Sequence, residues 1–278
     1  MTYGPADGHP ANSPLGEHAP HRQAPPGLAV SVAAHTLAGG LATGSIAVAL
    51  GQGAGLTLVY PATALGCYAI FAILLALHVG GHAPHDRFGA ANQVTLFRGV
   101  IASLIGGTIP VLDQLTAEAL WVASLAALLA LALDGIDGWL ARKTRMASLY
   151  GKLLDMNFDT VLMGILAVIA WQGGKVGVWV LAIGLARPIF VAVGWIWPIL
   201  RAELPFSQRR RVICVVQIAV LLVCPIPVVE PPLSSLAAAA ALGLLLFSFA
   251  VDTLWLVRSG AERDPGANQS RTDIRRVP

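Results

Sequence analysis

The stretch LAVSVAAHTLAGGLATGSIAVALGQGAGLTLVYPATALGCYAIFAILLALHV, residues 28–79, contains no Asp, Glu, Lys or Arg, and the uncharged run around it extends from 23 to 85. A transmembrane helix needs about 20 consecutive apolar residues, so the run has room for two. The Gly-rich segment GQGAG at 51–55 is the natural turn between them. The stretch therefore predicts a membrane-spanning hairpin over residues 28–80.

The composition of the whole chain points the same way. Of its 278 residues, 56% are hydrophobic and 12% charged, and the mean hydropathy is +0.70. A soluble domain carries roughly 25% charged residues, so a soluble fold of this length would lack the polar surface to cover itself. The composition disfavours soluble, disordered, collagen-like and nucleic-acid-binding proteins. We predict an all-α, polytopic bundle of transmembrane helices.

Apolar segments separated by polar interruptions predict eight spans. They are 28–50, 57–79, 94–112, 118–141, 149–172, 176–199, 211–229 and 233–257. Residues 1–27, rich in Pro, His and Gly, and residues 258–278 are predicted to be disordered tails.

The distribution of basic residues predicts the orientation. Eight spans place both termini on one side, and 14 of the 18 Lys and Arg residues fall in the tails and loops of that side, whereas Lys175 alone falls in a loop opposite. The positive-inside rule then makes the termini and the loops at 80–93, 142–148 and 200–210 cytoplasmic. Basic loops that face anionic lipid require no nucleic-acid partner.

Four acidic residues enter the predicted spans within DGIDGWLARKTRMASLYGKLLDMNFD, residues 134–159. Asp134 and Asp137 end the fourth span, and Asp155 and Asp159 begin the fifth. Spacings of three and four residues place each pair on one helix face. The loop between the spans is short, so they form an antiparallel hairpin. We expect four carboxylates to converge near the cytoplasmic interface.

Carboxylates that share a poorly hydrated pocket require cations. Hard divalent ions with oxygen ligands, Mg²⁺ or Mn²⁺, are the expected partners. The small residues Gly138, Ala141 and Gly151 leave room for a bulky ligand, and Arg142 offers a guanidinium suited to phosphate. This combination at a membrane surface indicates phosphoryl-group transfer on a lipid.

The same stretch resembles the signature D-x2-D-G-x2-A-R-x8-G-x3-D-x3-D of the class I CDP-alcohol phosphatidyltransferases, the family that includes the phosphatidylglycerophosphate synthases. Every fixed position is filled, by Asp134, Asp137, Gly138, Ala141, Arg142, Gly151, Asp155 and Asp159. The upstream segment NQVTLFR looks like the N-x2-T-x2-R of the family's first core helix, with Asn92, Thr95 and Arg98. The resemblance covers about 92–257, a six-helix core, and leaves the hairpin at 28–80 as an addition.

The resemblance implies a reaction and roles for these residues. An acceptor hydroxyl attacks the β-phosphate of CDP-diacylglycerol and CMP is released. Asp134, Asp137 and Asp155 would ligate two Mg²⁺ or Mn²⁺ ions, while Asp159 would complete the site and act as general base. The implied contacts to CDP come from Gly138, Ala141, Arg142, Gly151, Asn92 and Thr95.

The acceptor is less well indicated. Arg187 lies in mid-span, and Arg201 and Arg209 flank the next cytoplasmic loop; together they favour a phosphorylated acceptor, with glycerol 3-phosphate preferred over inositol phosphate, serine or a second lipid. The alternative for Arg187 is a structural pairing or a side chain that snorkels to the interface, and that for Arg201 and Arg209 is a basic patch that faces lipid and sets topology. The expected partners are CDP-diacylglycerol, this small alcohol, the bilayer and a second copy of the chain in a homodimer.

Two other functions fit parts of the pattern. Membrane aromatic prenyltransferases also use D-x2-D and D-x3-D motifs with Mg²⁺, but on distant helices, whereas here only 18 positions separate Asp137 from Asp155. Release of pyrophosphate would identify a prenyltransferase, and release of CMP a phosphatidyltransferase. A non-catalytic carrier or structural membrane protein would leave the signature unexplained.

Overall fold

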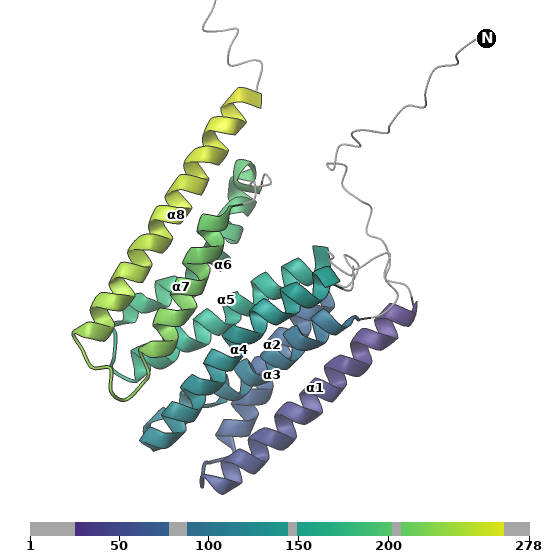
Figure 1. Cartoon of the computed structure of the whole chain (residues 1–278), viewed down its shortest axis with the longest axis vertical. Coiled ribbons are helices and arrows are strands. Elements are labelled where there is room, and N and C mark those ends of the chain that lie inside the picture. Colours follow the sequence, from purple (N-terminus) through teal and green to yellow (C-terminus); the bar gives the residue numbers. More distant parts are fainter. Residues whose placement is uncertain (1–25, 78–87, 144–148, 202–206, 264–278) are drawn as a thin grey trace, which may run out of the picture.

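The computed structural model of the chain describes residues 26–77, 88–143, 149–201 and 207–263, and every regular element within these ranges is a helix (Figure 1). The α-helices are α1 (Pro26–Gly53), α2 (Val59–Leu77), α3 (Ala90–Gly107), α4 (Ala117–Lys143), α5 (Leu149–Gln172), α6 (Leu181–Ile196), α7 (Gln208–Val223) and α8 (Leu233–Arg263). Short 3-10 helices are η2 (Ile109–Gln114), η3 (Val178–Val180) and η4 (Pro198–Arg201). The predicted all-α class is confirmed.

Six segments of the described chain are long and apolar enough to cross a membrane, and they correspond to α1, α2, α4, α5, α6 with η3, and α8. The predicted spans 94–112 and 211–229 become α3 and α7, which do not meet this criterion. Arg98 interrupts the apolar sequence of α3, although the helix itself is continuous. The first turn of α7 contains three consecutive arginines from Arg209. The eight-helix architecture is therefore roughly as predicted, and its apolar helices indicate a multi-pass integral membrane protein.

Two helices of the bundle end at other residues than predicted. The third span starts earlier, at Ala90, and its α-helix ends at Gly107, just before Pro110 in η2. Proline lacks the backbone N–H that an α-helix would need there. The last helix runs on to Arg263, past the predicted end at 257. The predicted tails fall almost entirely outside the described residues.

Successive helices run in alternating directions, so the two helices of the Asp-rich stretch form the predicted hairpin. Figure 1 shows that α4 ends and α5 begins at the upper end of the view, where α1 also begins and α8 ends. We call this the signature end. The opposite end carries η2, η3 and the connection between α7 and α8.

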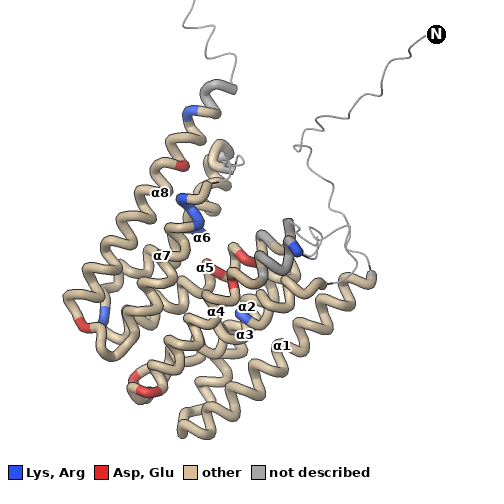
Figure 2. Tube along the Cα trace, in the orientation of Figure 1, with Lys and Arg blue, Asp and Glu red and all other residues tan. Residues whose placement is uncertain are grey.

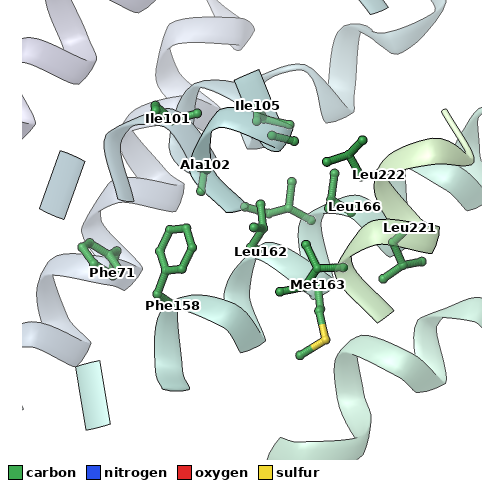
Figure 3. Close-up of a cluster of buried hydrophobic side chains, with 14 of the residues drawn as sticks. Phe71, Ile101, Ala102, Ile105, Phe158, Leu162, Met163, Leu166, Leu221 and Leu222 are labelled. Carbon is green, nitrogen blue, oxygen red and sulfur yellow. The ribbon is translucent and has the colours of Figure 1, made fainter. Parts of the chain in front are cut away.

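Helix α5 lies at the centre of the hydrophobic core and is the most buried of the candidate spans. Figure 3 shows Phe158, Leu162 and Leu166 of α5 among side chains from α2, α3 and α7. A helix that is packed on several sides is held firmly along its length. Acidic residues on α5 are therefore carried by the most tightly held element of the bundle.

Candidate metal centre

Three of the four predicted carboxylates converge at the signature end. Oxygens of Asp134 on α4 and of Asp155 and Asp159 on α5 all lie within 4.8 Å of one another. Figure 2 shows acidic segments of α4 and α5 side by side at this end. Asp137 lies on α4 three positions after Asp134, but its side chain is outside the described part of the structure.

Arg98 of α3 lies between these carboxylates and is fully buried. Its Nη1 donates to Oδ1 of Asp155 at 2.9 Å. Its Nη2 pairs with Oδ1 of Asp134 at 3.0 Å and of Asp159 at 3.3 Å. One planar guanidinium thus links α3 to both helices of the Asp-rich hairpin.

The guanidinium of Arg98 is itself held from two further directions. Its Nε donates to the backbone carbonyl of Ala130 on α4 at 2.9 Å. The face of the Phe158 ring lies 4.2 Å from Cζ, which is cation–π geometry. Phe158 immediately precedes Asp159, so the ring that supports the cation belongs to the same turn of α5 as the acids.

The three carboxylates share direct contact with one guanidinium, that of Arg98, and they still outnumber the cations when Arg187, which lies beside the turn carrying two of them, is included. Excess negative charge at a poorly hydrated site is unfavourable unless further cations bind. The side chains of Asp134, Asp155 and Asp159 remain 20%, 38% and 18% exposed, so an ion can reach them. An all-oxygen donor set suits Mg²⁺ or Mn²⁺ rather than softer metals. The residues present therefore fit the divalent ion predicted from the sequence.

Asp159 also has a neighbour on α7. The Cys214 thiol of α7 donates to its Oδ2 at 3.5 Å, while its Oδ1 faces Arg98. Both oxygens of Asp159 thus have donors within the bundle, which restricts the rotation of its carboxylate.

The comparison with known families bears directly on this cluster. A family model described as CDP-alcohol phosphatidyltransferase matches residues 88–254. The chain belongs to the CDP-alcohol phosphatidyltransferase family. No solved structure matches the chain significantly. The resemblance inferred from the signature is confirmed, and membership implies phosphotransferase activity for substituted phosphate groups. The match begins after α2, so the N-terminal hairpin lies outside it.

The predicted CDP-binding residues are dispersed around the acids of this phosphatidyltransferase. Asn92 and Thr95 are buried on α3, on the signature-end side of Arg98. Their side chains donate to carbonyls one turn earlier, Asn92 to Phe88 and Thr95 to Ala91 at 3.3 Å.

The glycines predicted to bind CDP lie on the two helices of the signature. Gly138 on α4 and Gly151 on α5 are half-buried. The side chains of Ala141 and Arg142, which complete the predicted set, are outside the described part of the structure.

The arginines predicted to bind the acceptor lie on α6, η4 and α7. Arg187 of α6 donates through Nη1 to the carbonyl of Met156 and to Oγ1 of Thr160 at 3.0 Å, which places it beside the turn that carries Asp155 and Asp159. Arg209 pairs with Asp252 of α8 at 2.5 Å. The side chain of Arg201 is outside the described residues.

The sequence analysis identified Arg98 only as part of the N-x2-T-x2-R motif, without a specific role, and it did not single out Phe158 or Cys214 as site residues. Arg98 had a signal, because a lone cation inside an apolar helix needs an anionic partner. Its exact partners depended on how α3 packs against the Asp-rich hairpin. Cys214 and Phe158 resemble ordinary apolar positions, and nothing in their spacing distinguishes them.

Proposed function

We propose that the protein transfers a phosphatidyl group from CDP-diacylglycerol to an acceptor hydroxyl with release of CMP, and that it depends on Mg²⁺ or Mn²⁺. The observation that carries the proposal is the convergence of Asp134, Asp155 and Asp159 within 4.8 Å around a single arginine. Asp137 is included as the fourth acid of the signature. These residues would hold two divalent ions, which when bound would supply positive charge against the pyrophosphate and the departing CMP.

Asp159 is proposed as the general base. The acceptor oxygen forms a bond to the β-phosphorus, the bond from that phosphorus to the oxygen shared with the CMP phosphate breaks, and the hydroxyl proton passes to the carboxylate of Asp159. Cys214 and Arg98 fix the orientation of that carboxylate from opposite sides. A positioned base of this kind needs no rearrangement of the helix when the proton moves.

The CDP moiety is proposed to lie against the small residues of the hairpin. Gly138 and Ala141 on α4 and Gly151 on α5 present little side chain on the faces that carry the acids. Arg142 would pair with phosphate. Asn92 and Thr95 on α3 would contact the nucleotide from the third side.

Glycerol 3-phosphate is the proposed acceptor, with Arg187, Arg201 and Arg209 as candidate ligands of its phosphate. Arg187 supports this choice most directly, since its Nη1 is bound to the turn that carries Asp155 and Asp159. A guanidinium has five N–H donors, so these bonds leave capacity for an anion. Arg209 is already paired with Asp252 and would have to share its charge with the ligand.

The activity is tested with purified full-length protein, CDP-diacylglycerol, Mg²⁺ or Mn²⁺ and a panel of acceptors, with the lipid product identified by mass. We expect CMP release that stops in excess chelator and a phosphatidylglycerophosphate product. Full activity in chelator would refute the metal assignment. Release of pyrophosphate from a prenyl donor, without CMP, would instead favour a prenyltransferase.

A second copy of the chain in a homodimer stays a prediction, tested by cross-linking in membranes.

The signature end is proposed to face the cytoplasm, together with both termini. An impermeant thiol reagent should label Met146→Cys from the cytoplasmic side and Gln172→Cys, at the far end of α5, from the other. The parent chain is the control, because Cys67 and Cys214 are half-buried within helices and Cys224 is buried just after the end of α7. Reversed labelling would overturn the proposed orientation.

A further inference from the structure

We propose that the N-terminal hairpin α1–α2 is part of the catalytic unit, and that Phe71 on α2 is a positioning residue that holds Arg98 in place through Phe158. The part of the inference that concerns catalysis rests on the proposed function. The hairpin lies outside the family match, which begins at 88. The contacts that carry the inference join α2 to α3 and α5 near the acid cluster.

Helix α2 packs so closely against α3 that a Cβ at either of two glycines of α3 would collide with an α2 side chain. A Cβ added to Gly99, the residue after Arg98, would lie 2.4 Å from Cε1 of Phe71. Further along α3, a Cβ on Gly106 would lie 2.7 Å from Sγ of Cys67. Small residues permit this close approach of membrane helices. The Phe71 ring is thereby fixed beside the backbone that carries Arg98.

The Phe71 ring also fixes the ring on which the guanidinium rests. Phe71 is 2% exposed and meets Phe158 edge-on, with ring centroids 6.1 Å apart and an interplanar angle of 86°. Figure 3 shows the two rings next to each other at one side of the core. Phe158 in turn places its face 4.2 Å from Cζ of Arg98. Shortening Phe71 would free the Phe158 ring to rotate and would remove one support of the cation that spaces the carboxylates.

A second contact independently ties α2 to the beginning of the signature half of α5. The Tyr150 hydroxyl donates to the carbonyl of Leu75 at 3.3 Å. Leu75 lies in the last turn of α2, where carbonyls have no partner within the helix. Tyr150 lies next to Gly151 of the signature. The hairpin therefore contacts α5 both at its start and at Phe158.

Helix α1 reaches the start of α3 in the same way. The backbone N–H of Phe88 donates to Oγ of Ser31 at 3.4 Å, and the side chain of Gln93 lies 3.0 Å from Nε2 of His35. The Tyr68 hydroxyl donates to the carbonyl of Thr36 at 2.7 Å and ties α1 to α2. A hairpin that served only as a membrane anchor would not need these polar contacts to the site helices.

The test compares Phe71→Leu with Tyr60→Leu in the full-length protein. Tyr60 is also an aromatic residue buried between α2 and α3, at 4% exposed, but it lies about 16 Å away along the helix. We measure Mn²⁺ affinity without substrate by electron paramagnetic resonance, together with the melting temperature, kcat and KM. Both variants should melt earlier. Only Phe71→Leu should weaken Mn²⁺ binding, by about 10-fold, the lower range for a residue that orients metal ligands.

A double-mutant cycle with Phe158→Leu tests the route. If Phe71 acts through Phe158, then Phe71→Leu costs no further Mn²⁺ affinity once Phe158 has been changed. Phe71→Met, which keeps more of the side-chain volume, replaces Phe71→Leu should that variant fail to fold. Unchanged Mn²⁺ affinity in the Phe71 variant, or fully additive losses in the cycle, would overturn the inference. Absence of CMP release by the wild type would refute the proposed function instead.

Discussion

The two ends of the bundle use acid–base contacts in opposite ways. At the end away from the signature, Nζ of Lys175 contacts Oε1 of Glu230 at 2.7 Å, one base with one acid, and Glu230 is 68% exposed. At the signature end, a fully buried arginine faces three partly buried acids. The first pair is charge-balanced and its acid is exposed, although the lysine side chain is only 14% exposed. The second cluster carries excess negative charge between helices.

This difference separates local stabilisation from function. A buried ion pair is weak evidence for stability, because removing the charges from water offsets the attraction between them. A surplus of carboxylates is still less favourable, since like charges repel. The bundle therefore carries the cluster at a cost in stability, which the proposed binding of a divalent cation would offset. Substitutions at the two ends should differ accordingly.

The largest effect is expected for Asp155→Asn. Loss of a metal ligand should reduce CMP release below detection and weaken Mn²⁺ binding. The metal-free melting temperature should not fall, because one of three competing acids becomes neutral while Arg98 keeps the other two. Turnover, Mn²⁺ titration and thermal unfolding without metal measure these effects.

Glu230→Gln is the matched control for Asp155→Asn, since it makes the same chemical change at the other end. It should leave turnover and Mn²⁺ affinity unchanged. A strong fall in metal-free stability of Asp155→Asn with normal turnover would mean that the cluster is a structural ion-pair network.

Asp159→Asn should have the next largest effect. If Asp159 accepts the proton, the variant loses about 10²–10⁴-fold in turnover, the usual cost of a missing general base. It should still bind Mn²⁺ and CDP-diacylglycerol, unlike Asp155→Asn. Nucleotide affinity and turnover across a Mg²⁺ series distinguish the two variants. Rescue by high Mg²⁺ would show that Asp159 is mainly a ligand, and normal turnover would exclude it as the base.

Arg98→Lys should produce a smaller loss, of about 10- to 100-fold in Mn²⁺ affinity or turnover. A lysine keeps the charge but cannot bridge three carboxylates with a planar fork or lie flat on Phe158. The melting temperature should also fall, because the hydrogen bond to Ala130 is lost. If the Arg98→Lys enzyme matches the wild type in Mn²⁺ titration, then Arg98 contributes only its positive charge and not its planar geometry.

The sequence predicted the features that depend on composition or on spacing along one helix, namely the helices themselves and the placement of the acids. Apolar length predicted eight helices, and the i, i+3 and i, i+4 spacings placed Asp134, Asp155 and Asp159 on facing sides of one hairpin. Pro110 explains why α3 ends earlier than predicted. These properties are local, and the short loop between α4 and α5 permits only an antiparallel arrangement.

The sequence could not predict contacts that depend on packing between distant helices. Arg98 reaches the acids only because α3 crosses both helices of the hairpin. Phe71 reaches Phe158 only because Gly99 lets α2 approach α3. Neither aromatic side chain has a spacing that differs from that of ordinary core residues. The contacts that the N-terminal hairpin and Arg98 make with the helices of the Asp-rich stretch therefore became visible only in three dimensions.

The smallest effect is expected at the opposite end, for the double substitution Lys175→Met with Glu230→Gln. An exposed pair contributes about 0.5 kcal/mol, and removing both partners leaves no uncompensated charge. The backbone carbonyl of Lys175 would still accept from the hydroxyls of Ser234 and Ser235, so the contact between the α5–α6 connection and α8 survives. Thermal unfolding and CMP release should both match the wild type. A loss of activity comparable to that of Arg98→Lys would show that the two ends of the bundle are coupled through α5. In that case the Lys175–Glu230 pair would matter for activity as the acid cluster does, and the contrast between the two ends would fail.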